Sequence, residues 1–284
     1  MVFFFNIATS SEKIEYSSNT IKILENGKIV YGEGDVQIEI DDNIFISSET
    51  FEYNKKTGLY KIFNNVQFKD NLNNIEASGS EFIFSTFDNK ILSKTKAKII
   101  YNQTYNIDLN NFEYDIYDQK ISSNDFVRIK DNINNYFELY EFLFDIKKNK
   151  FLGKEIKFID NQQNKYLLNE VMINTYNKNL YGKDLNIDFN KSMFGNNNND
   201  PRIKAKSIKI KDQSSFLKKG VFTSCSKDND CPPWSMYAEE IEHDKTEQII
   251  KYKNAWLKIY DVPTVYFPRF SHPDPTVKRK SGFL

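Results

Sequence analysis

The first 200 residues of this 284-residue chain contain no proline, because all seven prolines lie at or after Pro201. Proline lacks the backbone N–H that a β-ladder needs, so it is excluded from the interior of a sheet. The proline-free stretch is therefore compatible with continuous strand pairing. The later prolines Pro263, Pro268, Pro273 and Pro275 predict that the chain leaves the sheet near its end.

Other absences exclude several classes of function. The formal charge is zero, with 39 basic and 39 acidic residues, so no overall field favours nucleic acid as a partner. After the first eleven residues, no stretch is apolar for long enough to span a bilayer as a helix. Only two histidines occur, His243 and His272, and neither lies near a nucleophile motif. Cys225 and Cys231 lack further ligands at zinc spacing, so we expect no metal site. Because the sequence shows no catalytic constellation either, we expect no cofactor and no enzymatic activity.

The chain does contain a repeat of about 30 residues. Its opening apolar residue recurs at spacings of 30, 31, 30, 30 and 29, and its closing apolar residue recurs almost as regularly. Two registers kept over six units are typical of a repeat architecture. The opening positions are Ile21, Phe51, Phe82, Phe112, Phe142 and Val171, and the closing positions are Val36, Val66, Ala97, Val127, Ile156 and Leu185.

Within each unit, apolar and polar residues alternate with a period of two. Val36, Ile38 and Ile40, for example, are separated by polar residues. This alternation predicts strands with one face in a core and the other in water, about two strands per unit. The apolar face is compatible with a filled core or with an open groove, and periodicity alone does not separate the two.

The two ends of the chain differ from the repeats. Residues 1–11 are a short apolar run followed by small residues, which fits a clipped signal peptide or a frayed N-terminus. The C-terminal block holds both cysteines, both tryptophans and most of the prolines. Several of its motifs together resemble one family: Phe222-Thr223-Ser224-Cys225, Trp234, Asn254-Ala255, Val262-Pro263, Tyr266, Pro268 and the run 278–284.

That family is the LPS-assembly outer-membrane proteins, called LptD or OstA. The repeats resemble its OstA-type periplasmic domain, weakly in each unit, whereas the C-terminal block resembles it strongly. The resemblance implies a V-shaped β-jelly roll, an antiparallel stack of hairpin units that carries lipid A acyl chains. After residues 1–11, the expected clipped signal peptide, it divides the chain into the periplasmic β-jelly roll (12–220) and a final hairpin with a proline-rich hinge (221–284). The hinge would lead to an outer-membrane β-barrel that this chain lacks.

The resemblance implies a function in lipopolysaccharide transport and outer-membrane assembly, with this part in the periplasm. Lipopolysaccharide would pass from a periplasmic bridge protein to the barrel, and a plug lipoprotein would bind through the barrel. The bridge would pair with the N-terminal edge strand, marked by Ile21, Ile23 and Val30. The expected lipid-groove residues are Val36, Ile38, Val66, Phe68, Val127, Ile129, Ile156 and Phe158.

The family resemblance leaves the disulfide pairing of the two cysteines open. Cys225 matches a family cysteine that bonds to the barrel, whereas the family's N-terminal cysteine has no counterpart here. We expect Cys225 to pair with Cys231 when the barrel is absent, in a loop whose closure stabilises the fold by only about 2–3 kcal/mol. Pro263, Pro268, Pro273 and Pro275 are assigned to the hinge.

Two alternatives remain at this stage. A free-standing periplasmic bridge protein would share the repeats, but it would not need the proline-rich segment or the Ser281–Leu284 run. A secreted β-solenoid that binds or cleaves glycans would need exposed stacking aromatics or paired carboxylates at a fixed place. The sequence shows neither at a consistent position.

Overall fold

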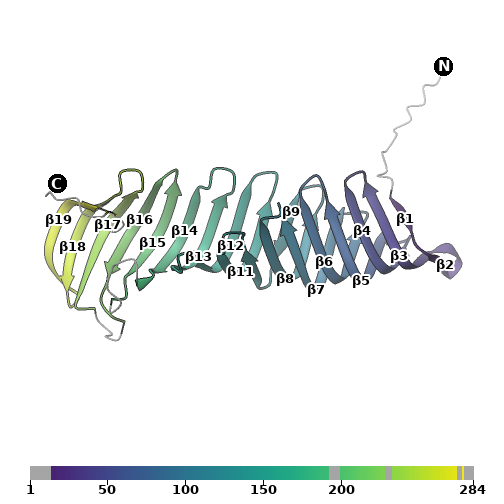
Figure 1. Cartoon of the computed structure of the whole chain (residues 1–284), viewed down its shortest axis with the longest axis horizontal. Coiled ribbons are helices and arrows are strands. Elements are labelled where there is room, and N and C mark those ends of the chain that lie inside the picture. Colours follow the sequence, from purple (N-terminus) through teal and green to yellow (C-terminus); the bar gives the residue numbers. More distant parts are fainter. Residues whose placement is uncertain (1–13, 192–198, 228–231, 274–276, 278–284) are drawn as a thin grey trace, which may run out of the picture. The chain divides into compact units, whose positions relative to one another are not determined.

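The computed structural model describes residues 14–191, 199–227, 232–273 and 277, and most of these residues lie in antiparallel strands (Figure 1). The predicted all-β class is confirmed. The chain divides into two compact units, Met1–Tyr117 and Asp118–Leu284. The predicted boundary after residue 220 falls inside a strand of the second unit, and the assignment of functions on its two sides stays a prediction.

Unit 1 is a stack of hairpins in which each long strand pairs with the next one along the chain. Polar turns of a few residues connect these strands. The elements of unit 1 are β1 (Glu15–Ser17), β2 (Thr20–Leu24), the 3-10 turn η1 (Glu25–Gly27), β3 (Ile29–Asp41), β4 (Ile44–Asn54), β5 (Leu59–Asp70), β6 (Ile75–Ser85), β7 (Lys90–Tyr101) and β8 (Tyr105–Asp115).

Unit 2 continues the same pattern of neighbouring antiparallel strands from β11 to β19. Two short strands, β9 and β10, both pair with β11. The strands are β9 (Lys120–Ser123), β10 (Val127–Lys130), β11 (Tyr136–Asp145), β12 (Lys150–Ile159), β13 (Lys165–Asn174), β14 (Leu180–Asp188), β15 (Arg202–Lys211), β16 (Ser214–Thr223), β17 (Trp234–Asp244), β18 (Ile249–Ile259) and β19 (Val262–Pro273).

Many long strands bend in the middle at a residue with positive φ. Asn65 in β5 and Asp184 in β14 have φ of 54° and 51°, and the residue that follows each of them is buried. Asparagine and aspartate enter this left-handed region more readily than most residues. The buried residues on the two sides of Asp184, Gly182 and Leu185, are three positions apart, so the left-handed residue shifts the alternation by one position and both halves of the strand face the same interior. Further non-glycine residues with positive φ inside strands are Asp35, Asn64, Asn111, Glu141, Glu155, Lys219 and Asn254.

The 30-residue repeat in the sequence marks buried positions of the strands. All six closing positions are buried, and so are five of the six opening positions. Six of the buried residues directly follow a positive-φ residue of their strand, namely Val36, Val66, Phe112, Phe142, Ile156 and Leu185. The one opening position that is not buried is Ile21, which lies in the edge strand β2 and is 48% exposed.

The expectation that the C-terminal prolines take the chain out of the sheet is wrong for residues 262–273. These residues form β19, which pairs with β18 along its length. Within the described residues β19 has a partner on one side only, and proline is tolerated in such an edge strand. Pro268 lies between the paired positions Arg269 and Phe267, opposite the bend at Asn254. Pro275 lies outside the described residues, and a hinge role for these prolines stays a prediction.

Candidate functional site

The interior of unit 1 is filled by its own side chains. Four of the residues predicted to line a groove, Val36, Ile38, Val66 and Phe68, are buried, whereas the intervening Gln37 is exposed. Their inward direction therefore agrees with the alternation in the sequence. Their role in binding lipid is untested and stays a prediction.

A buried hydrogen-bond cluster links β5 to β8 inside unit 1. The Tyr114 hydroxyl donates to Asp70 Oδ2 at 2.6 Å, and the Asn73 side-chain amide donates to the same oxygen at 2.8 Å. Burial raises the pKa of Tyr114, and the Asp70 carboxylate raises it further. The ring of Tyr114 also packs against Phe68, with centroids 5.8 Å apart. This part of the interior is held by specific polar contacts as well as by apolar packing.

Unit 2 holds the other four predicted groove residues in a more open setting. Val127, Ile129 and Ile156 are buried, but Phe158 is only half-buried. The neighbouring polar residues Arg128 and Lys157 are exposed. In unit 2, therefore, part of the predicted apolar lining stays accessible to solvent.

Phe158 belongs to a continuous row of apolar side chains, which we call the apolar row. Each member pairs directly with the next across neighbouring strands, from β10 to β19. Neighbouring strands are about 4.8 Å apart, so the row extends about 43 Å. The apolar row consists of Ile129, Phe137, Phe158, Tyr166, Ile187, Ile203, Phe222, Met236, Leu257 and Val265.

The apolar row lies on the inward side of the sheet but is incompletely covered. Leu257 and Met236 each lie two residues from a fully buried alanine, Ala255 and Ala238, and so point to the same side. Most members are half-buried, and Val265 is 43% exposed. A half-covered apolar line is able to accept an apolar ligand without first displacing a packed core.

Aromatic contacts shape the first part of the apolar row. The Phe137 and Phe158 rings stack with centroids 4.4 Å apart, and Phe158 lies 5.0 Å from Tyr166. The Tyr166 hydroxyl donates to Asp160 Oδ2 at 3.0 Å. Burial raises the pKa of Tyr166, with a smaller contribution from Asp160, so this hydroxyl stays neutral at physiological pH.

Sequence reasoning identified only Ile129 and Phe158 among the members of the apolar row. The alternation marks inward residues in each strand, but it does not say which of them face one another across strands. That information comes from the pairing register, which is fixed by the bends and by the turns between strands. The sequence does offer one signal for the row. A large apolar residue lies two positions from a small residue of the same strand, as Met236 does from Ala238 and Leu257 from Ala255.

Two of the three residues predicted for the partner edge lie in an edge strand, and their role in partner binding stays a prediction. Ile21 and Ile23 lie in β2, which pairs only with β3 among the described residues, and Ile23 is 68% exposed. The placement of Val30 on this edge is wrong. Val30 lies in β3, is buried, and pairs with Ile23 on one side and with Tyr53 on the other.

Cys225 lies beyond the end of β16 and is half-buried. Its thiol is 3.6 Å from the Trp234 carbonyl oxygen, and its own carbonyl accepts a hydrogen bond from Arg202 at 2.6 Å. Cys231 lies outside the described residues, so the pairing of Cys225 with Cys231 stays a prediction.

The described part of the chain offers no group of three or more His, Cys, Asp or Glu residues arranged to hold a metal ion. Among the same residues, no helix is long and apolar enough to cross a membrane. Both histidines lie in strands, His243 in β17 and His272 in β19. His272 Nε2 lies 3.0 Å from the Tyr252 hydroxyl.

Comparison with known proteins gives matches to part of the chain. No family model matches it. Over 109 residues it is 40% identical to the LPS-assembly protein LptD of Yersinia pseudotuberculosis, a match that covers 37% of this chain and 13% of the relative. Shorter matches, each 24% of this chain and 8% of the relative, reach 43% identity with LptD of Sodalis glossinidius and 41% with LptD of Salmonella typhi. The resemblance to LPS-assembly proteins is thus confirmed over part of the chain.

A solved structure is also similar in part. It is LptH of Pseudomonas aeruginosa, described as the LptA-homologous periplasmic component of the lipopolysaccharide transport device. The match covers 40% of this chain and 83% of that protein, with 12% identity and a TM-score of 0.36.

Proposed function

We propose that this chain takes part in lipopolysaccharide transport to the outer membrane and that it shields lipid acyl chains along the apolar row of unit 2. The row carries the proposal, because it is a long, continuous and half-covered apolar line. The 40% identity with an LPS-assembly protein over 109 residues supplies the ligand class. The protein acts by binding and passing on its ligand, and it catalyses no reaction.

Physical chemistry explains why such a row suits a lipid carrier. Each methylene exposed to water costs about 0.8 kcal/mol, so an acyl tail of about a dozen methylenes costs about 10 kcal/mol in an aqueous compartment. Apolar contact is non-directional. A tail is therefore able to move from Phe158 towards Leu257 between similar surfaces without complete exposure to water.

Unit 1 contributes in a different way in this account. Because its interior is filled, with Val36 and Val66 completely buried, acyl chains enter it only if its layers separate. Its exposed strand β2 is the docking edge for a periplasmic bridge protein, through Ile21 and Ile23. Delivery to an outer-membrane barrel and contact with a plug lipoprotein follow from the family resemblance alone.

A binding experiment tests the lipid assignment. Met236→Asn with Leu257→Asn places amides in the apolar row, whereas the control Leu167→Asn with Met172→Asn changes exposed apolar residues of β13 that lie outside the row. We expect the row variant to bind lipopolysaccharide about tenfold more weakly and the control to bind normally. This corresponds to about 1.4 kcal/mol, a small part of the apolar contact that is lost.

Deacylated lipopolysaccharide provides the second arm of this experiment. It should bind far more weakly than the acylated form, because the row recognises the tails. Equal binding of both forms, or equal loss in the row and control variants, would reject the function. Circular dichroism of each variant checks that the strands are retained.

A further inference from the structure

Positive charge is concentrated in one segment of this formally neutral chain. Residues 202–227 contain eight basic residues and one acidic residue, Asp212. Most of this segment forms the hairpin of β15 and β16, whose lysines are exposed. The basic residues are Arg202, Lys204, Lys206, Lys209, Lys211, Lys218, Lys219 and Lys227.

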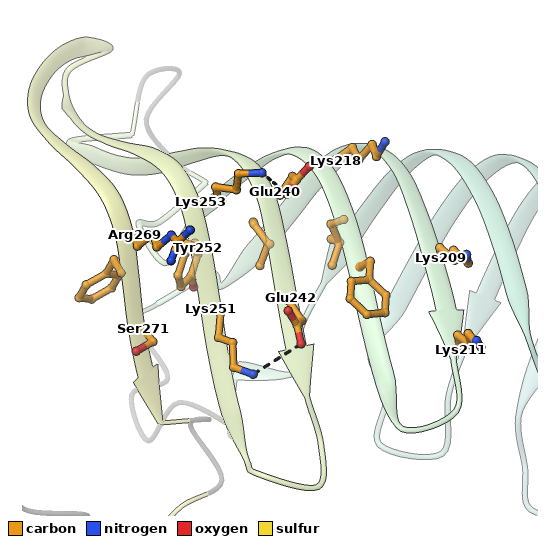
Figure 2. Close-up of a pocket in the computed structure, with 14 residues that line it drawn as sticks. Lys209, Lys211, Lys218, Glu240, Glu242, Lys251, Tyr252, Lys253, Arg269 and Ser271 are labelled. Carbon is orange, nitrogen blue, oxygen red and sulfur yellow. Dashed lines mark hydrogen bonds and ion pairs between the residues drawn. The ribbon is translucent and has the colours of Figure 1, made fainter. Parts of the chain in front are cut away.

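Several of these cations line a hollow of about 1030 Å³ over β15–β19 (Figure 2). The charged side chains around it are exposed or half-buried and alternate with the buried Leu217, Ile241 and Tyr252. They therefore lie on the outward face of the sheet, opposite the apolar row. We call this feature the cationic hollow. The basic residues that line it are Lys209, Lys211, Lys218, Lys251, Lys253 and Arg269.

Only part of this charge is neutralised within the chain. Lys253 pairs with Glu240 at 3.2 Å and Lys251 with Glu242 at 3.6 Å, as Figure 2 shows. The other four cations of the hollow, Lys209, Lys211, Lys218 and Arg269, have no acidic partner among the residues that the structure describes.

Elsewhere on the outward face of unit 2, several lysines are paired with carboxylates of a neighbouring strand. Lys183 pairs with Glu170 at 2.6 Å, and Lys154 pairs with Glu141. Lys157 pairs with Glu138 at 3.1 Å. The basic residues of β15 and β16 have no such carboxylate partner among the described residues, although ion pairing resumes between β17 and β18, so this side of the cationic hollow keeps unpaired charge.

The spacing of the unpaired cations favours an extended anion. Lys209 lies on β15 and Arg269 on β19, four strand spacings apart, which is about 19 Å. A single phosphate does not span this distance, whereas a chain of sugars with several phosphates does. Multiple contacts to lysine and arginine provide affinity for such a ligand.

We propose that the cationic hollow binds the phosphate-bearing sugar headgroup of lipopolysaccharide. This inference rests on the proposed function, since that function supplies the ligand. The edge strand β19 is suited to both parts of such an amphiphile. Arg269 pairs with the outward-facing Lys253, whereas the half-buried Phe267 and Phe270 pair with the buried Ala255 and Tyr252 and therefore point to the inward face.

The test compares two triple variants that remove the same charge. One carries Lys209→Gln, Lys218→Gln and Arg269→Gln in the cationic hollow. The matched control carries Lys154→Gln, Lys157→Gln and Lys183→Gln, three ion-paired lysines of the same unit. Affinity for purified lipopolysaccharide is measured at low and at high salt, with intact and with enzymatically dephosphorylated ligand.

We expect the hollow variant to bind intact lipopolysaccharide about tenfold or more weakly at low salt and to lose most of the salt dependence. The control variant should bind intact lipopolysaccharide almost normally. For dephosphorylated ligand, the hollow variant and the unchanged protein should have the same affinity. Equal effects of the two triple variants would overturn the inference. Equal affinity of the unchanged chain for intact and dephosphorylated ligand would overturn it as well.

Two further arms identify the source of the phosphate. Inorganic phosphate should compete only weakly, and phosphatidylglycerol vesicles should bind less well than lipopolysaccharide. Stronger binding of either probe would overturn the headgroup assignment. Tail-dependent binding without charge dependence would reject only the headgroup site, whereas no binding of lipopolysaccharide by the unchanged chain would reject the proposed function too.

Discussion

Tyr252 shows how single residues connect the interior of unit 2 to its edge. Its ring is buried, and its hydroxyl lies 3.0 Å from His272 Nε2 on the edge strand β19. The two rings stack with centroids 5.5 Å apart. Burial raises the pKa of Tyr252 to about 12. The contact therefore helps to hold β19 on β18 while the hydroxyl keeps its proton.

This pKa predicts a loss of stability in alkali. In the unfolded chain tyrosine titrates near pH 10, so between about pH 10 and 12 the unfolded state binds fewer protons than the native state. The contribution of Tyr252 is therefore fully present below about pH 10 and is lost as the pH rises through 12. A two-unit shift corresponds to about 2.7 kcal/mol. We expect Tyr252→Phe to reduce the slope of unfolding free energy against pH in this range.

Denaturant unfolding at several pH values from 8 to about 11.5 measures that slope. Tyr176→Phe is the control, because Tyr176 is 84% exposed. The account of Tyr252 fails if both variants leave the alkaline slope equally unchanged.

At the scale of elements, the bends in the strands predict how substitutions act. Glu155 has φ of 49° in the middle of β12 and is exposed. A β-branched residue is strained in this left-handed region, at a cost of about 1–2 kcal/mol, whereas glycine adopts it readily. We expect Glu155→Val to destabilise the fold by about that amount and Glu155→Gly to be neutral or stabilising.

The matched control is Lys204→Val, an exposed position of β15 whose backbone is ordinary extended strand. It should have little effect, because valine favours strands. Thermal unfolding of the three variants provides the comparison. A Glu155→Val variant as stable as Lys204→Val would contradict the importance of the bend.

The strands and their inward residues follow from the sequence to a large extent. Alternation predicted the buried direction of Val36, Val66 and Ile156 correctly. It did not predict the bends, since residues such as Glu155 and Lys219 are ordinary strand surface residues by type. Their left-handed conformation depends on pairing with neighbouring strands, which a local pattern does not contain.

The two ends of the strand series were harder to predict for a similar reason. The rule against proline in a sheet applies to interior strands, and the sequence does not say that residues 262–273 lie at an edge. Val30 is close to Ile21 and Ile23 in sequence, but closeness in sequence does not show which residues share an edge strand. The pairing of Val30 with both β2 and β4 places it inside the sheet.

The exposed strand β2 is the proposed docking edge for the bridge protein. A proline at position 23 removes one backbone N–H and distorts the edge, so Ile23→Pro should weaken docking of a purified bridge protein at least about tenfold. Ile23→Thr keeps the backbone donor and should have a much smaller effect. A pulldown combined with circular dichroism checks both. Equal docking of the proline and threonine variants would argue against pairing through this edge.

At the scale of the molecule, the two units differ in how they present apolar surface. Unit 1 buries its inward residues almost completely, whereas the apolar row of unit 2 remains half-covered. The outward face of unit 2 carries the cationic hollow. The apolar row is the basis of the proposed function, and the cationic hollow adds a surface that matches the anionic headgroup of the same lipid.

Site-specific photo-crosslinking in an active transport assembly tests the central claim most directly. A photoreactive residue in place of Ile129 or Phe222, both in the apolar row, should capture lipopolysaccharide. The same residue in place of Arg128 or Leu167, which are exposed and lie outside the row, should capture little or none. Equal capture at both sets of positions, or no capture from the apolar row while transport proceeds, would contradict a lipid path along it.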